Sequence, residues 1–169
     1  MAAVFVLLGV NTGVFLASGT PSEALDSVAW FVLLALFMLE TGRTLTMRVA
    51  AAARIARLVA AVALVAALAG YVREEEWLDV LNTTQWIAVV ALLELEVRSP
   101  DAVRRHRAGF AAAAAALYAG LAALVLAWLW RGDWFGAYDA ALWLVAFGVL
   151  EMNVLGLIGS NRRVTGCPG

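Results

Sequence analysis

The chain has 169 residues, a net charge of −1, 64% hydrophobic and 15% charged residues, and a mean hydropathy of +0.87. Soluble domains are about 45–50% apolar and about 25% charged, so this composition excludes an ordinary water-soluble globule. The single cysteine excludes an intrachain disulfide scaffold, and the near-neutral charge argues against a nucleic-acid partner.

A membrane-spanning helix needs about 20 mostly apolar residues. The sequence predicts an all-α membrane protein with six such helices, at 2–18, 21–42, 52–72, 78–97, 108–130 and 135–159. We interpret the first segment as a retained helix rather than a signal peptide, because no basic residues precede its apolar run.

Local signals mark where three of these helices start. Thr20-Pro21-Ser22-Glu23 combines a capping box with proline at the first helical position, which predicts the start of the second helix. Ser99-Pro100-Asp101 predicts the start of the fifth in the same way, and Asp133 is a candidate N-cap for the sixth.

Arginine predicts the orientation of the chain in the membrane. Ten arginines fall on one side of the predicted bundle and only Arg73 and Arg131 on the other, so we expect both termini in the cytoplasm. The expected location is the prokaryotic cytoplasmic (inner) membrane, with several passes. The opposite side gathers acidic residues, which form either a solvated rim or a surface that attracts cations: Glu23, Asp26, Glu74, Glu75, Glu76, Asp79, Asp133 and Asp139.

The three even-numbered segments resemble one another. Trp30, Trp86 and Trp143 are spaced by 56 and 57 residues, and Asp26, Asn82 and Asp139 stand four residues before them. This register predicts three copies of one helical hairpin, at about 1–44, 45–98 and 99–161, followed by a cytoplasmic tail at 162–169. Such repeats are common in transport folds, and they also arise by duplication in bundles without a transport role.

Tryptophan favours the interface between lipid and water, where its ring is apolar and its N–H stays hydrated. The sequence therefore predicts an aromatic belt on the outer side of the bundle. Its members are Trp30, Trp77, Trp86, Trp130, Trp134 and Trp143.

Several carboxylates fall within the apolar segments, where an ionised group is costly unless it is paired or faces protein or water. Glu40 precedes Arg43 by three residues and Glu94 precedes Arg98 by four, which predicts ion pairs along each helix. Glu96 lies about 200° around the helix from Glu94. We therefore expect one of the two to face the bundle and the other to meet a loop arginine or a partner protein.

Glu151 is the carboxylate predicted to lie nearest mid-membrane, with Asn153 close by in the chain and Asn11 at a similar depth. Three interpretations remain open. The group is hydrogen-bonded within the bundle, belongs to a proton or cation relay, or contacts another membrane protein.

Residues typical of catalysis and of metal binding are scarce. His106 stands alone among arginines, Cys167 lies alone in the tail, and the chain has no lysine. No catalytic motif is present, so we expect neither an enzyme nor a metal site nor a bound cofactor. The alanine-rich start of the fifth segment, 109–116, predicts close helix packing inside the bundle or against a partner.

Three functions fit this pattern. The first is a non-catalytic accessory or assembly subunit of a larger respiratory or photosynthetic membrane complex, with lipids and other membrane subunits as partners. The second is a small proton- or cation-translocating channel or transporter that uses Glu151, with a candidate site of Glu151, Asn153, Asn11, Glu94, Glu96 and Glu40. The third is a membrane protein that binds a lipid or pigment without a metal ligand.

Overall fold

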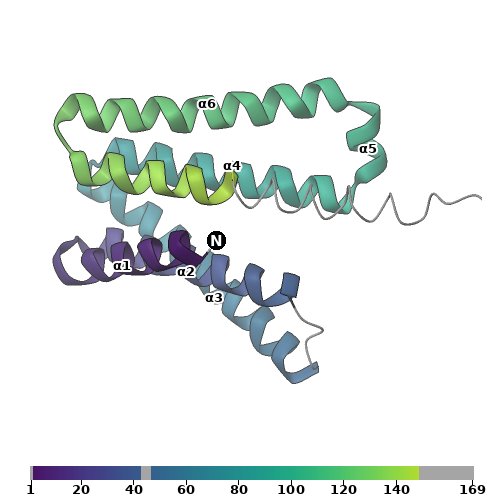
Figure 1. Cartoon of the computed structure of the whole chain (residues 1–169), viewed down its shortest axis with the longest axis horizontal. Helices are drawn as coiled ribbons and strands as arrows, with labels where there is room; N and C mark the ends of the chain where they lie inside the picture. The colour runs from purple at the N-terminus through teal and green to yellow at the C-terminus, as the bar shows by residue number, and fades with distance from the viewer. Residues whose placement is uncertain (1, 43–46, 149–169) are drawn as a thin grey trace, which may run out of the picture.

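The chain folds into helices joined by short turns. The computed structural model describes residues 2–42 and 47–148. Seven helices lie in these ranges: α1 (Ala2–Ser18), α2 (Pro21–Gly42), α3 (Met47–Glu74), α4 (Trp77–Arg98), α5 (Pro100–Arg105), α6 (Arg107–Arg131) and a seventh helix at 134–148 (Figure 1). The all-α prediction is confirmed.

Four of these helices contain apolar stretches long enough to cross a membrane: α2, α3, α4 and α6. Helix α1 is apolar but has only 17 residues. The seventh helix is described only as far as residue 148. A membrane location is therefore compatible with the fold, whereas the prediction of six spans and of their orientation stays a prediction.

Side chains cap the backbone at two of the three predicted helix starts, whereas Ser99 makes no side-chain cap bond at the start of α5. The Thr20 backbone N–H donates to Glu23 Oε2 at 2.6 Å, and the Glu23 N–H donates to Thr20 Oγ1 at 3.2 Å. These two bonds make the capping box that the sequence predicts. The Gly136 N–H donates to Asp133 Oδ1 at 2.9 Å, so Asp133 caps the seventh helix as expected.

The predicted fifth helix is divided in two. Pro100 begins the short helix α5, which ends at Arg105, and α6 begins at Arg107. His106 separates them, because its φ of −117° departs from helical geometry. The third helix also differs from the prediction: it covers Met47–Glu74 instead of 52–72.

Three helices form the inside of the bundle: α2, α4 and the seventh helix. Helix α3 contacts both α2 and α4, α1 packs on α2, and α6 packs on α4. Helix α1 also meets the seventh helix, where the rings of Phe15 and Phe135 lie 5.0 Å apart. Helix α6 meets it where Trp128 packs with Ala137 and Ala140. Each outer helix (α1, α3 and α6) thus contacts two inner helices.

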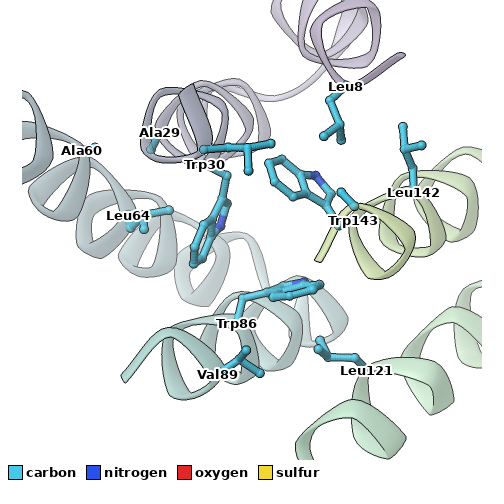
Figure 2. Packing of buried hydrophobic residues seen from close by; sticks show 12 residues of the cluster. Leu8, Ala29, Trp30, Ala60, Leu64, Trp86, Val89, Leu121, Leu142 and Trp143 are labelled. Atoms are coloured by element: carbon cyan, nitrogen blue, oxygen red, sulfur yellow. The ribbon is translucent and has the colours of Figure 1, made fainter. Parts of the chain in front are cut away.

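The centre of the bundle is a layer of three tryptophans, one from each inner helix, which we call the tryptophan layer. Trp30 lies 6.4 Å from both Trp86 and Trp143, measured between ring centroids. Figure 2 shows the three side chains pointing toward one another between Leu8, Leu64 and Leu121. Aromatic rings at such distances attract each other through edge-to-face contacts.

The prediction of an aromatic belt is wrong for the three tryptophans of the tryptophan layer. Trp30, Trp86 and Trp143 are only 7%, 3% and 6% exposed, so they lie inside the protein instead of on its outer surface. Their shared position along three similar helices reflects mutual packing. The other three predicted members, Trp77, Trp130 and Trp134, are exposed, and their place at a lipid interface stays a prediction.

The outward faces of the helices are apolar. Ile55, Leu58 and Val62 of α3 are each more than 60% exposed. Most of the alanine run of α6 is exposed too, so the expectation that it packs inside the bundle is wrong, and packing against a partner stays a prediction. The exposed residues are Ala111, Ala112, Ala113, Ala115 and Ala116. Apolar faces of this extent are unfavourable in water, and they suit a lipid or protein environment.

Gly70 of α3 gives a test of the α2–α3 contact. A Cβ atom at Gly70 would lie 2.1 Å from Ser22 Oγ and 3.1 Å from Ser22 Cβ. Ser22 Oγ donates to Glu74 Oε1 at 2.8 Å, so moving it out of the way breaks that bond. We expect Gly70→Ala to lower the stability of the protein in detergent by about 1–3 kcal/mol, as overpacking does elsewhere.

Gly109→Ala on α6 is the matched control, because no atom lies within 4 Å of the added Cβ. Alanine favours a helix over glycine by about 1 kcal/mol, so this variant should be neutral or stabilised. Equal effects of the two substitutions on denaturant or thermal unfolding would contradict the packing described for α2 and α3.

Candidate functional site: an acidic cavity above the tryptophan layer

A polar cavity of about 80 Å³ lies where the N-terminal ends of the three inner helices meet. The turns that join α1 to α2 and α6 to the seventh helix lie at the end of the bundle opposite α5 (Figure 1), and the residues that line the cavity stand near these turns. We call it the acidic cavity. Its lining residues are Phe15, Glu23, Asp26, Ser27, Tyr71, Asp79, Asn82, Trp128, Asp133, Phe135, Gly136 and Asp139.

Each inner helix contributes one polar side chain at the same place. Asp26, Asn82 and Asp139 each stand four residues, or about one helical turn, before a tryptophan of the tryptophan layer. All three line the acidic cavity. The tryptophan contacts therefore place these three polar groups around one space, with the aromatic layer beneath them.

The two aspartates receive hydrogen bonds from neighbouring helices. Asn11 Nδ2 of α1 donates to Asp139 Oδ1, and Thr83 Oγ1 of α4 donates to Asp26 Oδ1 at 3.3 Å. Each aspartate also accepts a hydrogen bond from the tryptophan of its own helix, Trp30 or Trp143. Such bonds offset part of the cost of placing a carboxylate in an apolar bundle.

Asn82 differs from the two aspartates. Its Oδ1 atom is fully buried and has no hydrogen-bond partner among the described residues. A buried oxygen without a donor typically costs about 1–3 kcal/mol. Asn82 lines the acidic cavity, and an N–H or O–H donor that reached its Oδ1 atom would remove this cost.

The acidic cavity adjoins a second space of about 220 Å³ toward the end of the bundle. Glu23, Asp79 and Asp133 line both spaces, whereas Glu76 and Arg131 line only the outer one. Carboxylates outnumber the single arginine, so the opening carries a negative charge that favours the entry of cations over anions.

Three aromatic side chains from the outer helices complete the wall: Phe15 of α1, Tyr71 of α3 and Trp128 of α6. They are spaced by 56 and 57 residues, the same spacing as the inner tryptophans. Tyr71 and Trp128 are buried, and Phe15 is partly buried. Aromatic rings thus surround the carboxyl groups from three sides.

The acidic groups do not converge on one point as metal ligands do. Within residues 2–42 and 47–148, no group of three or more His, Cys, Asp or Glu side chains is placed to hold a metal ion. The carboxylates are instead distributed around the cavity. This arrangement suits a ligand of low charge density better than a compact divalent ion.

The structure tests some of the predicted polar residues. Arg98 Nε lies 2.5 Å from Glu94 Oε1, which confirms the predicted ion pair, and both side chains are exposed. Glu96 is exposed as well, so the expectation that one of Glu94 and Glu96 faces the bundle is wrong. Helix α4 places both outside because its inward face at this end is apolar, with Leu93 packed against the core.

Asn11 does not line the acidic cavity, but it donates a hydrogen bond to Asp139, which does. Glu151 and Asn153, together with the Glu40 side chain and its predicted partner Arg43, lie outside the described residues. The relay around Glu151 stays a prediction. The site contains instead groups that the sequence analysis assigned to a rim, with Asp26 and Asp139 turned into the bundle.

A signal for this arrangement is present in the sequence. The 56- and 57-residue register that relates the tryptophans also relates Phe15, Tyr71 and Trp128, and it relates Thr20, Glu76 and Asp133 at the helix starts. When the same 56- and 57-residue spacing is applied to the helix starts and to the outer helices as well, it relates residues that line the cavity or the space that adjoins it. The tryptophan and its preceding polar residue alone leave the direction of the shared face undetermined.

No protein-family model, curated protein or solved structure matches the chain. The function must therefore be argued from the chemistry of the acidic cavity.

The Asn11–Asp139 contact joins α1 to the seventh helix and can be tested by substitution. We expect Asn11→Ala to destabilise the protein by about 1–3 kcal/mol, because the half-buried carboxylate loses its donor from α1. In an Asp139→Leu background the same substitution should cost much less. Unfolding measurements on the double-mutant cycle decide the matter, and an equal cost in both backgrounds would refute the contact.

Proposed function

We propose that this protein is a small cation-coupled membrane transporter whose binding site is the acidic cavity. One observation carries the proposal: three helices of an apolar bundle bring carboxyl groups together in a cavity. Ionisable groups within apolar helices are costly, and in membrane proteins they commonly mark ion or proton pathways. The residues proposed to bind the cation are Asp26, Asp79 and Asp139, in place of Glu151.

The helix ends favour the charged form of two acidic side chains at the site, Asp79 and Glu23. The N-terminus of a helix carries a partial positive charge that favours nearby anions. Asp79 stands in the first turn of α4, and Glu23 stands in the first turn of α2. The three converging N-termini would also attract an anionic ligand, but the carboxylates already occupy that role and repel further negative charge.

The tryptophan layer supports a site that is open at one end. Beneath it the described core is apolar, with Leu34, Val89 and Ala146 packed around the rings. A cation in the acidic cavity would meet Trp30, Trp86 and Trp143 as a barrier to further movement. We propose that this arrangement is one state of an alternating-access cycle, in which the three inner helices must separate for release.

We further infer that the hairpins form a threefold internal repeat. In support, α3 and α6 each contact the inner helix that follows and the inner helix of the preceding hairpin, and α1 closes the ring by contacting α2 and the seventh helix of the last hairpin. Leu8, Leu64 and Leu121 follow the 56- and 57-residue spacing and are all buried in one cluster. Transport folds are often built from repeats with the substrate site at their interface.

Flux through vesicles tests the proposed transport. The full chain is reconstituted into liposomes, and the movement of sodium, potassium, ammonium and protons is followed with ion-selective electrodes and an internal pH dye. At least one cation should move faster than in protein-free vesicles. Asp26→Asn and Asp139→Asn should each slow this movement at least about tenfold, which corresponds to the loss of one charged contact.

Glu94→Gln is the matched control, because it removes a carboxylate of the same bundle that is exposed and paired with Arg98. Its flux should equal that of the unaltered protein. The proposal is contradicted if no cation moves above background, or if the asparagine variants, folded by gel filtration, transport as fast as the unaltered protein.

An accessory-subunit role is the second candidate, and one observation favours it. The exposed small residues of α6 offer a surface on which another membrane helix could approach closely, between Ala111 and Ala116. Purification in a mild detergent should then recover stoichiometric partner chains. A single-component particle that transports cations would favour the transporter instead.

A further inference from the structure

The acidic cavity combines two kinds of surface that a simple inorganic cation does not need together. Carboxylates supply charge, and the lining also includes aromatic side chains from three outer helices. Phe15, Tyr71 and Trp128 belong to different helices, yet all three border the same cavity. Rings attract cations through their negatively charged faces, and this attraction is typical of sites for organic ammonium groups.

The distribution of charge excludes a tight site for a bare metal ion. The described part of the chain holds no cluster of three metal-ligating side chains, although four acidic residues border the cavity besides Asp133. A metal ion requires several oxygens at about 2.0–2.6 Å. A cation that spreads its charge over several N–H groups can instead contact carboxylates that are further apart.

Asn82 adds a requirement for a hydrogen-bond donor. Its Oδ1 is buried without a hydrogen-bond partner. Asn82 lines the cavity at the position of α4 that corresponds to Asp26 and Asp139 on the other two inner helices. Sodium or potassium would have to coordinate this oxygen directly, and a quaternary ammonium has no N–H to donate. A protonated amine has such donors, and its N–H groups match one amide oxygen and two carboxylates.

We propose that the acidic cavity binds a small protonated amine, whose ammonium group donates to Asn82 Oδ1 and to the neighbouring carboxylates while its alkyl part packs against Phe15, Tyr71 and Trp128. This inference rests on the proposed cation site and specifies its ligand class. The neighbouring mouth, of about 220 Å³, leaves room for the alkyl end of the molecule toward solution.

Equilibrium binding to the purified full chain in nanodiscs tests the ligand class. The probes are the chloride salts of methylammonium, tetramethylammonium, sodium and potassium at equal ionic strength, and binding is measured by calorimetry and by tryptophan fluorescence. Methylammonium should bind at least about tenfold more tightly than sodium and potassium, the equivalent of about 1.4 kcal/mol. It should also bind more tightly than tetramethylammonium, which lacks a donor for Asn82.

Three variants assign the contacts. Asn82→Leu should weaken methylammonium binding and bring it close to that of tetramethylammonium. Phe15→Leu should weaken the binding of both organic ions about two- to fivefold, in line with a cation–π contact of about 0.5–1 kcal/mol. Phe5→Leu is the control, because Phe5 packs against Phe31 away from the cavity and should leave binding unchanged.

The outcomes separate this inference from the proposed function. If sodium or potassium binds as tightly as methylammonium and Asp26→Asn abolishes that binding, the amine inference is overturned and the cation site stands. If tetramethylammonium equals methylammonium, the role of Asn82 as acceptor is overturned. If none of the four cations binds, the amine inference is wrong, and the cation site stands only if the flux assay shows proton movement that Asp26→Asn slows. The comparison among probes needs no variant, so it holds even where Asn82→Leu fails to fold.

Discussion

The contact among Trp30, Trp86 and Trp143 is the interaction on which the rest of this structure depends. In lipid, helices gain little from burying apolar surface against each other, and close packing becomes the main source of association. Three large rings at one level bring α2, α4 and the seventh helix together (Figure 2). The side chains one turn nearer the helix starts, Asp26, Asn82 and Asp139, are thereby brought together as well, although they are polar.

That coupling explains how carboxylates are kept inside an apolar bundle. Asp26 and Asp139 share hydrogen bonds with the tryptophans of their own helices and with Thr83 and Asn11 of neighbouring ones. The same bonds that hold the aspartates also hold the orientation of the rings below them. A ligand that changed these hydrogen bonds would act directly on the packing of the three inner helices. The proposed transport cycle uses this link between the polar and the aromatic layers.

Local signals in the sequence predicted much of the fold and less of the site. The capping box at Thr20, the N-cap at Asp133 and the Glu94–Arg98 pair depend on neighbours within four residues, and the structure has all three. The facing direction of Trp30 and its equivalents depends on contacts between residues more than 50 positions apart. An indole suits both a lipid interface and a protein interior, so residue type alone could not decide. Asp26 and Asp139 shared this ambiguity, since a polar residue near a helix start suits a solvated rim equally well.

Chemical accessibility tests the central claim, an open and negatively charged cavity above the tryptophan layer, most directly. Cys167→Ser removes the only native cysteine, and Asn82→Cys or Ser18→Cys places a thiol in the cavity or on the exposed surface at the same end. The rates of modification by aminoethyl and sulfonatoethyl methanethiosulfonate are then compared, one reagent being cationic and the other anionic. The account predicts a ratio of cationic to anionic rates at position 82 at least about tenfold above that at position 18, as expected for a negative potential of a few kT. Equal ratios at the two positions, or no reaction at position 82 in the folded protein, would contradict it.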